Sequence, residues 1–321
     1  MPEFSPLDQA LLRTVAYYDV FDYPLTSAEI WRWLYRRADE TITATHAEVG
    51  AALAALVQAG TLLQEKDWFV LPGRQQLVQL RAERFVLGQK KWRRVKSMAR
   101  FCEVIPYVKM VAACNTLAID NARAESDMDV FIVTSPERMW IARMMVTGIV
   151  NMLGYRRHGK NITNRVCLSF YVTAQALDLE PLKISVGQED PYLRFWATQI
   201  VPLMDDGIYE KFQQHNAWVT SRLPNGWFWN WKERLLSVES MLRTIKHSFE
   251  AAFATGIGLQ LEDWARRFQL KRINGHTNSK AKLGTTEVII SENVLKFHEE
   301  DRRNKYNLAF RIRLAQLGIP E

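Results

Sequence analysis

The stretch VKMVAACNTLAIDNARAESDMDVFIVT, residues 108–134, decides the fold that this sequence predicts. It opens with an apolar strand at 108–113, passes through a polar turn and a short helix, and ends in a second strand. Side chains alternate between the two faces of a strand, so residues two apart point the same way, about 7 Å apart. Asp127 and Asp129 therefore project together at the mouth of the buried run 130–133. Two such carboxylates form an oxygen-only site that suits Mg²⁺ and a phosphate-bearing substrate.

The length indicates two or three domains, and the expected strands and helices indicate a mixed α/β (α+β) fold class. The chain has 321 residues, a net charge of +7 and a pI of about 9.3, which favours polyanionic partners without requiring them. Its three cysteines have no metal-binding spacing, which is typical of a reducing compartment. The N-terminus lacks a basic region followed by an apolar run, and no stretch reaches about 18 uninterrupted apolar residues. We expect a cytoplasmic protein without a membrane partner.

Residues 1–80 predict a winged-helix-like domain. Helices are expected at 5–18, 26–34 and 45–60, each opened by a Ser or Thr that is followed three positions later by an acidic residue. A hairpin is expected at 62–71. The third helix contains no Lys or Arg, whereas a helix that reads a nucleic-acid groove needs donors for phosphates and base edges. This favours a protein-docking or structural role, with nucleic-acid contact as the alternative.

The central domain is expected at 81–215, and a long basic helix at 75–101 connects it to the first. That helix is either a solvated connector or a positive rim that delivers phosphates to the aspartates. A helix at 135–154, a third strand at 166–172 and a helix at 191–204 are expected to complete a mixed sheet with flanking helices.

Residues 216–321 predict a mainly helical C-terminal region. Its tryptophan-rich start, at 218–231, is expected to pack against the central domain rather than to stack bases. There follow a long helix at 232–270, a polar loop at 274–286, a short strand at 287–290 and a final helix that contains 295–314. Four basic positions in the last segment either face the active site or coat the surface: Lys296, His298, Arg302 and Arg303.

The run of strand, small polar turn, short helix, S-D-x-D and apolar strand resembles the nucleotidyltransferase superfamily. This is the fold of polymerase β and of the kanamycin-type and minimal nucleotidyltransferases, and the resemblance extends to a bacterial group that adds a winged helix. It covers roughly residues 100–175. The family's Gly-Ser or Gly-Gly turn aligns here with Asn115 and Thr116, and its D-x-D aligns with Asp127 and Asp129.

The resemblance implies Mg²⁺-dependent (or Mn²⁺-dependent) transfer of a nucleoside monophosphate from an NTP to a hydroxyl acceptor. Asp127 and Asp129 would be the catalytic residues and the metal ligands, and Thr116 would take the place of the phosphate-binding serine. Asn115 replaces the glycine of the turn and tolerates a left-handed backbone better than other residues. Ser126 would orient the first aspartate or the turn.

The third carboxylate of the family has no counterpart in the strand at 166–172, where the polar residue is Ser169. Asp178, Glu180 and Asp190 lie nearby in the sequence. Either one of them substitutes, or the domain is a catalytically degenerate module that binds nucleotide or nucleic acid in a regulatory role. A glycosyltransferase, which also uses D-x-D, is disfavoured because the winged-helix region leaves no room for its longer βαβ nucleotide-binding unit.

Basic side chains are expected to bind the triphosphate beside this acidic pair. Arg138 and Arg143 lie in the first two turns of the helix after the D-x-D strand, where they either reach the triphosphate or lie on the surface. We expect the aspartates to converge in a cleft with the Thr116 hydroxyl, and cations to face that cleft. The expected partners are an NTP and an RNA, protein or small-molecule acceptor.

Overall fold

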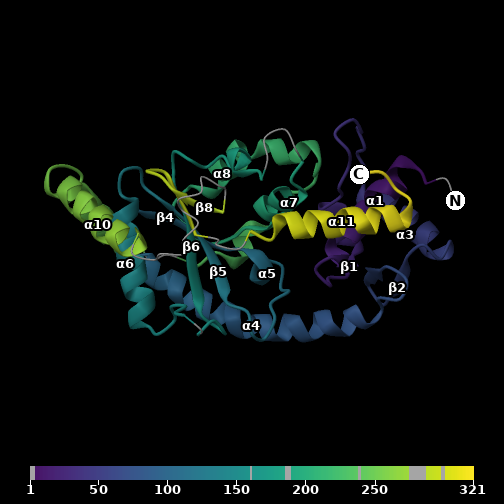
Figure 1. The fold of residues 1–321 in the computed structure, drawn as a ribbon, viewed down its shortest axis with the longest axis horizontal. Helices are drawn as coiled ribbons and strands as arrows, with labels where there is room; N and C mark the ends of the chain where they lie inside the picture. The colour runs from purple at the N-terminus through teal and green to yellow at the C-terminus, as the bar shows by residue number, and fades with distance from the viewer. Residues whose placement is uncertain (1–3, 160, 185–188, 238–239, 275–286, 298–300) are drawn as a thin grey trace.

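The computed structural model describes residues 4–159, 161–184, 189–237, 240–274, 287–297 and 301–321 (Figure 1). The chain is a mixed α/β protein with a small three-stranded sheet near its N-terminus and a six-stranded mixed sheet at its centre. No helix in the described ranges is both long and apolar enough to cross a membrane. The predicted polar loop, from residue 275 onward, and His298 lie outside the described residues.

The N-terminal unit consists of short helices packed on the small antiparallel sheet. Its elements are α1 (Pro6–Asp19), β1 (Leu25–Thr26), α2 (Ser27–Arg32), α3 (His46–Gln58), β2 (Leu63–Glu65) and β3 (Trp68–Val70). The predicted helix starts are confirmed, since Ser5, Thr26 and Thr45 each form a capping box with the acidic residue three positions later. The predicted hairpin is the β2–β3 pair, and β1 adds an unpredicted third strand.

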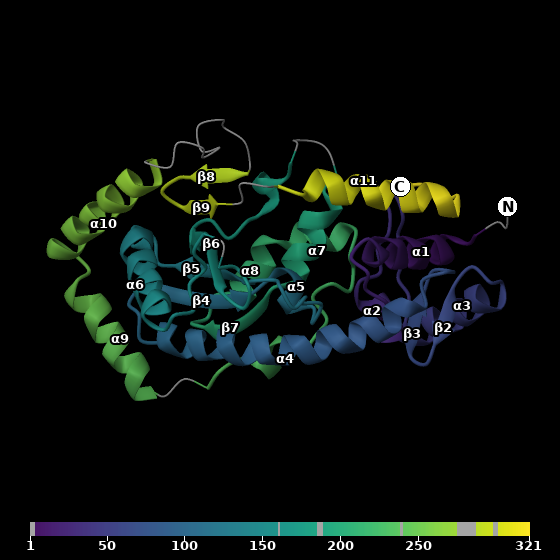
Figure 2. The same cartoon turned by 60° about the horizontal axis from the view of Figure 1, so that its bottom comes forward.

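The predicted basic helix is α4 (Gln76–Cys102), which runs along both the N-terminal unit and the central sheet (Figure 2). In its first half, Arg81 forms an ion pair with Glu29. The same guanidinium lies 3.9 Å from the centroids of the Tyr23 and Trp68 rings. Because Arg81, Arg84 and Lys91 make such contacts, one side of α4 is packed, while Lys90, Arg93 and Arg100 remain exposed.

The central sheet has the strand order β7–β4–β5–β6–β9–β8. The strands are β4 (Val108–Ala113), β5 (Met128–Thr134), β6 (Val166–Thr173), β7 (Val201–Asp205), β8 (Val288–Ile290) and β9 (Val294–Phe297). Among these six strands of the described chain, β5 and β6 pair in parallel and the other neighbours pair antiparallel. β5 buries Val130 and Ile132 on one face and Phe131 and Val133 on the other, as a strand covered on both sides requires. The strands predicted around the D-x-D motif are confirmed.

Helices cover both faces of this sheet. α4, α6 (Met139–Met152) and α10 (Ile257–Asn274) contribute to the core on one face. The other face packs against α7 (Pro191–Gln199) and α8 (Tyr209–His215). The tryptophan-rich segment packs against this second core, together with η2 (Ala217–Ser221), which confirms the predicted packing role. The aspartates on β5 therefore sit at the end of a three-layer core.

The predicted helix at 191–204 is wrong in its second half. α7 ends at Gln199, Ile200 is extended, and β7 begins at Val201 beside β4. The residue before a proline is biased toward extended backbone, so Pro202 opposes continuation of the helix. β7 is an edge strand, which is where a sheet tolerates a proline.

The predicted long helix at 232–270 is broken. The structure has η3 (Trp231–Arg234), then α9 (Ser240–Ala252), and then α10. Between the two α-helices, Gly256 has a φ of +51°, a left-handed conformation that ends helices and that glycine adopts without strain.

The predicted final helix begins later than expected. Its first residues form β9, which pairs with β6, and α11 (Arg303–Leu317) follows. The strand depends on a partner more than a hundred residues away, so its local sequence did not reveal it. α11 packs against α1, while β8 and β9 complete the central sheet. The domain boundaries at 80 and 215 stay predictions.

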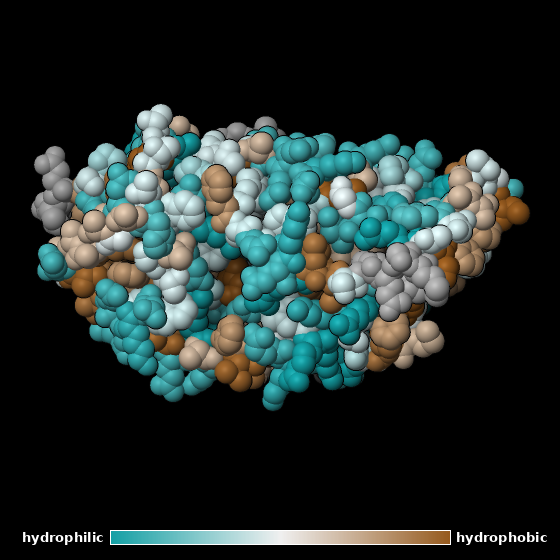
Figure 3. Space-filling view, turned by 180° about the vertical axis from the view of Figure 1, so that it is seen from behind, coloured by the Kyte–Doolittle hydropathy of each residue, from teal (hydrophilic) through white to brown (hydrophobic). Residues whose placement is uncertain are grey.

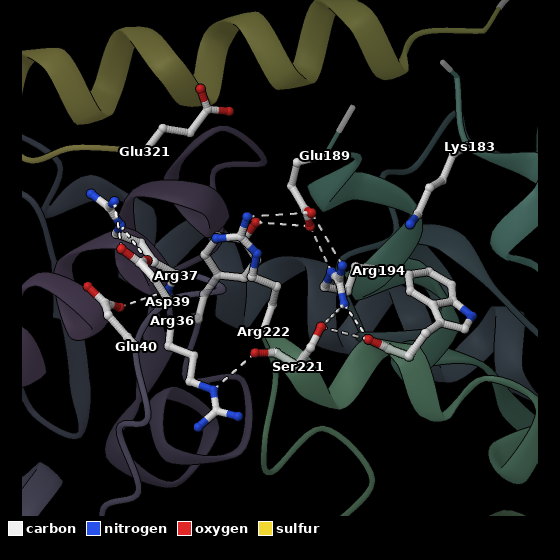
Figure 4. Close-up of polar contacts among 12 residues, drawn as sticks. Arg36, Arg37, Asp39, Glu40, Lys183, Glu189, Arg194, Ser221, Arg222 and Glu321 are labelled. Carbon is white, nitrogen blue, oxygen red and sulfur yellow. Dashed lines mark hydrogen bonds and ion pairs between the residues drawn. The ribbon is translucent and has the colours of Figure 1, made fainter. Parts of the chain in front are cut away.

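A buried ionic cluster joins the N-terminal unit to the segment around α7 (Figure 4). Arg194 forms an ion pair with Glu189 at 2.8 Å and donates to the carbonyl oxygens of Trp218 and Val219. Arg36 of the N-terminal unit donates to the backbone oxygen of Ser221 in the same region. A single guanidinium thus satisfies several buried acceptors where the two units meet.

Replacement of Arg194 by methionine is expected to destabilise the chain by about 3 kcal/mol, because Arg194 is buried and its loss removes one partner each from Glu189 and from the carbonyl oxygens of Trp218 and Val219. Urea unfolding measures the change. The control is Arg37→Met, which removes the exposed Arg37–Asp39 pair and is expected to leave stability unchanged. Equal losses in the two variants would contradict the structural role given to the buried cluster.

Candidate functional site

The two aspartates lie side by side at the start of β5. Asp127 directly precedes the strand and Asp129 lies within it, so both project from the same face. Asp129 is the register partner of Cys167 on β6. One ligand atom from each of Asp127, Asp129 and Cys167 lies within 4.8 Å of the others. The structure therefore brings together the predicted pair and adds a thiol that the sequence analysis did not include.

A buried lysine supports the turn that carries this pair. The Lys91 ammonium group donates to the backbone oxygen of Ser126 at 2.6 Å and to the side-chain oxygen of Asn164 at 2.9 Å. Ser126 itself donates through its hydroxyl to the backbone oxygen of Arg123. Ser126 thus belongs to the turn that leads into β5, and Lys91 holds this turn in place. The expected role of Ser126 in orienting Asp127 or the Asn115–Thr116 turn stays a prediction.

The turn after β4 is built on Asn115. This residue has a φ of +56°, so the predicted left-handed backbone is confirmed. Its side-chain oxygen accepts a hydrogen bond from the Trp196 indole at 2.7 Å. A further hydrogen bond to Asp129 lowers the pKa of that carboxyl group and opposes the effect of burial. Asn115 and Thr116 form the first turn of α5 (Asn115–Ala118), beside the acidic pair.

These groups open into a cavity of about 1070 Å³. One wall carries Asn115, Thr116, Ser126, Asp127, Asp129 and Cys167. Six cationic side chains also line it: Arg143, Arg156, Arg157, Lys296, Arg302 and Arg303. The predicted convergence of the aspartates with Thr116 in a cleft faced by cations is confirmed. The C-terminal basic positions within the described residues face this cavity rather than coat a distant surface.

The two aspartates of the acidic pair repel each other electrostatically. Burial, and then repulsion from Asp127, raises the pKa of Asp129 to about 6. Burial and the nearby Asp129 charge raise the pKa of Cys167 to about 12, so its thiol is neutral near pH 7. The Arg157 guanidinium lies 2.6 Å from an oxygen of Asp127 and offsets part of the negative charge. Such a pair favours a bound cation, because a cation relieves the mutual repulsion.

Arg143 lies in the cavity wall, where the sequence analysis placed it as one alternative. It donates to the side-chain oxygen of Gln269 at 2.5 Å, and its guanidinium lies 5.0 Å from the centroid of the Phe297 ring. These contacts fix its position before any ligand enters. Arg138 instead donates to the backbone oxygen of Ala254 and is not among the residues that line the cavity.

The three acids considered as a third carboxylate do not reach the pair. Asp178 and Glu180 are exposed, and Glu180 forms an ion pair with Lys183. Asp190 is buried, where it caps α7 and forms an ion pair with Arg303. None of them is among the described residues that line the cavity. The position beside Asp129 on the neighbouring strand is occupied by Cys167 instead.

The expected phosphate rim on the basic helix is also not formed within the described chain, since no cavity-lining residue belongs to α4. Arg81 is paired with Glu29, and Arg84 donates to Asn121. Lys91 contacts the turn before β5 through the backbone oxygen of Ser126 and is not among the residues that line the cavity. The cations of the site come instead from α6, from the loop before β6 and from the C-terminal segment with β9 and the start of α11.

The wall opposite the aspartates is an ordered ionic cluster that the sequence analysis identified only in part. Arg303 contacts Asp301 at 2.6 Å and Asp190 at 2.9 Å, and Lys296 lies 3.5 Å from Asp301. Burial, and then the charge of Arg303, lower the pKa of Lys296 to about 8. Asp301 follows the undescribed positions 298–300, and only the tertiary fold brings it to the cavity.

Comparison of the chain with models of protein families, with curated proteins and with solved structures gives no match. The site is therefore interpreted from its own geometry.

The ionic wall gives a pH-dependent stability with a defined sign. Burial alone would raise the pKa of Asp301, but the hydrogen bonds and charge of Arg303 outweigh it and lower the pKa from 3.8 to about 2. A lowered carboxyl pKa stabilises the fold above the unfolded value, and that contribution is lost as the pH falls through about 4 to 2. Asp301→Asn is expected to cost about 2 kcal/mol at pH 7, and its difference from the native chain shrinks below about pH 4.

Urea unfolding at a series of pH values measures this difference. The control is Asp263→Asn on α10, whose side chain is 55% exposed in its pair with Arg267. It is expected to leave stability unchanged at every pH. A loss for Asp301→Asn that stays constant as the pH falls would show that the charge of Asp301 is not its cause.

Proposed function

We propose that the protein is a divalent-cation-dependent nucleotidyltransferase that transfers a nucleoside monophosphate from an NTP to a hydroxyl acceptor. The observation that carries the proposal is the placement of Asp127 and Asp129 together at the start of a buried strand, in a cavity with several cations. Carboxylates at this spacing suit Mg²⁺ or Mn²⁺, and the cationic wall suits a triphosphate. The central unit is, on this proposal, nucleotidyltransferase-like.

The residues present fit a divalent cation. Asp127 and Asp129 would hold it through carboxylate oxygens, while the Cys167 sulfur lies beside them as a neutral thiol, which is a poor ligand for Mg²⁺. When bound, such an ion neutralises triphosphate charge and polarises the phosphoryl group for in-line attack. The raised pKa of Asp129 supports this role, because a buried carboxylate beside another carboxylate lacks full compensation in the protein alone.

The chain's own residues position the nucleotide on this proposal. Arg143 is held by the neutral Gln269 before substrate enters, so it offers positive charge with little further loss of side-chain freedom. Lys296 and Arg303 are held by Asp301, and Arg303 also by Asp190, so these carboxylates offset part of their charge. The Asn115–Thr116 turn places a hydroxyl group beside the aspartates. The Arg157 guanidinium forms an ion pair with the Asp127 carboxylate. If a cation bound that carboxylate, the guanidinium would be released and would contact a phosphate oxygen instead.

The N-terminal unit supports the second part of the proposal, a winged-helix-like module that recruits the acceptor. Its order of helices and strands, with β2 and β3 forming a hairpin after α3, is that of a winged helix. The α3 helix carries no Lys or Arg, which favours a protein surface over nucleic acid as its contact. The proposed acceptor is a hydroxyl group on RNA, on a protein or on a small molecule.

A specific observation favours a second candidate, a regulatory module that binds nucleotide without transferring it. The position paired with Asp129 holds Cys167, whose neutral thiol cannot accept a proton from the incoming hydroxyl. The remaining acid in the described cavity lining, Asp301, does not join the pair and is held by Arg303 and Lys296. The two candidates share the nucleotide site and differ in whether it turns over.

The first test incubates the chain with each labelled NTP and with Mg²⁺ or Mn²⁺. Transfer of label with release of pyrophosphate is expected, and Asp127→Asn and Asp129→Asn are each expected to reduce the rate at least a hundredfold. Asp178→Asn serves as the control, because Asp178 is exposed and outside the cavity. Nucleotide binding without turnover would support the regulatory module instead. Absence of both binding and turnover would contradict a nucleotide site in this cavity.

The second test supplies the missing carboxylate. Cys167→Asp places an acid opposite Asp129, where it adds an oxygen ligand and a proton acceptor. We expect at least a tenfold gain in the Mg²⁺-supported rate, or its appearance if the native chain only binds nucleotide. Cys102→Asp is unsuitable as a control because Cys102 is buried in the core, so Cys167→Ser is used. Equal rates for the Asp and Ser variants would show that this position does not limit transfer.

A further inference from the structure

An arm made of α9 and α10 lies at the end of the molecule opposite the N-terminal unit (Figure 2). α9 is attached through polar side chains. Lys246 is buried and donates to the backbone oxygen of Val108, and Glu250 accepts from the backbone N–H of Tyr107. Glu250 also contacts the Lys109 ammonium group at 3.1 Å. The inner face of this helix is therefore its charged face.

α10 is attached in the same way. Glu262 accepts hydrogen bonds from the backbone N–H groups of Trp140 and Ile141 at the start of α6. Gln269 is buried and donates to the backbone oxygen of Trp140. With Ala265, these residues recur at intervals of three and four and form one face of the helix. A helix that packs on a domain usually turns its apolar face inward, and here much of that face is polar.

Ala265, Leu270 and Ile273 of α10 pack on the central core, but seven large apolar side chains of the arm are left in solvent. They are Ile245, Phe249 and Phe253 on α9 and in the following turn, and Ile257, Leu261, Trp264 and Phe268 on α10. Each of the seven is between 36% and 65% exposed. Figure 3 shows hydrophobic side chains gathered at the end of the molecule where the arm lies. Single exposed apolar residues are ordinary, but stripes along two successive helices indicate a surface that binds something.

The charge of the side chains beside these apolar stripes indicates which kind of partner binds to the arm. Five basic side chains on the arm are exposed: Arg243, Arg266, Arg267, Lys271 and Arg272. Asp263 is the exposed carboxylate among the described residues of the two helices, and Arg267 pairs with it. A second copy of the chain would bring these cations against one another in a symmetric contact, which disfavours self-association here. The expected partner therefore presents both negatively charged groups and apolar groups.

We propose that the arm binds the surface of an anionic lipid bilayer and inserts its apolar stripes into the interface. Lys and Arg beside a stripe of Trp, Phe, Leu and Ile is the composition of helices that lie in a membrane surface. The arm forms a projecting edge of the molecule, which suits a flat surface (Figure 2). The sequence expectation of no membrane partner rested on the lack of a spanning segment, and a surface helix needs none. This inference is independent of nucleotidyl transfer.

Flotation of the full chain with vesicles tests the proposal. Binding is expected to vesicles of equimolar phosphatidylcholine and phosphatidylserine and to be at least tenfold weaker to phosphatidylcholine alone. Trp264→Ser with Phe268→Ser is expected to abolish binding, and Lys271→Glu with Arg272→Glu to weaken it at least twentyfold, since each basic residue near such a surface contributes a factor of about five. The control is Phe85→Ser on α4, which removes a 50% exposed aromatic ring outside the arm.

Circular dichroism and thermal unfolding check that each variant keeps the native fold. The proposal is overturned if the native chain binds neither vesicle, or if the arm variants bind as well as the native chain. It is also overturned if the arm variants instead abolish a concentration-dependent dimer or an association with an acidic protein. Nucleotide binding is expected to be equal in all these variants, so failure here leaves the proposed enzymatic function untouched.

Discussion

The site depends on holding two like charges side by side at the end of β5. Their repulsion favours separation, and the strand prevents it because the residues that follow are buried on both faces of the sheet. A slip of one residue in the pairing with β4 or β6 would turn Val130 and Ile132 into the opposite core and point both carboxylates away from the cavity. Core packing therefore keeps the two carboxylates together despite their repulsion, and this repulsion contributes to the raised pKa of Asp129.

The remaining parts of the molecule converge on this strand from distant points in the chain. Lys91 of α4 supports the turn before β5 from behind, and Trp196 of α7 fixes Asn115 beside it. The last strand and the start of α11 supply the ionic wall around Arg303. Since α11 also packs on α1, the cavity wall and the N-terminal unit share one element.

Local signals were sufficient for part of this account. The capping residues Ser5, Thr26 and Thr45 marked helix starts correctly, because a cap is satisfied by residues within three positions. The alternation of Asp127 and Asp129 also follows from strand geometry alone. The role of Cys167 could not be predicted, since only the register of β5 against β6 places the thiol beside Asp129. A scan of the third strand for thiols and hydroxyls as well as acids would have named Cys167 as a candidate without placing it beside Asp129.

The errors have the same origin. β9 was assigned to a helix because its pairing partner lies far away in the sequence, and the basic residues of α4 were taken as available because their partners are also distant. The apolar stripes of α9 and α10 would be assigned to the core from periodicity alone, and the structure shows polar residues there instead. Which face of a helix is buried is a tertiary property that periodicity does not fix.

The most direct measurement of the central claim is anomalous diffraction at the manganese absorption edge from crystals soaked with Mn²⁺ and a non-hydrolysable NTP. The account predicts one strong peak between the carboxylates of Asp127 and Asp129, with the triphosphate extending toward Lys296 and Arg303. A peak elsewhere, or nucleotide in the cavity with no metal at the two aspartates, would contradict it.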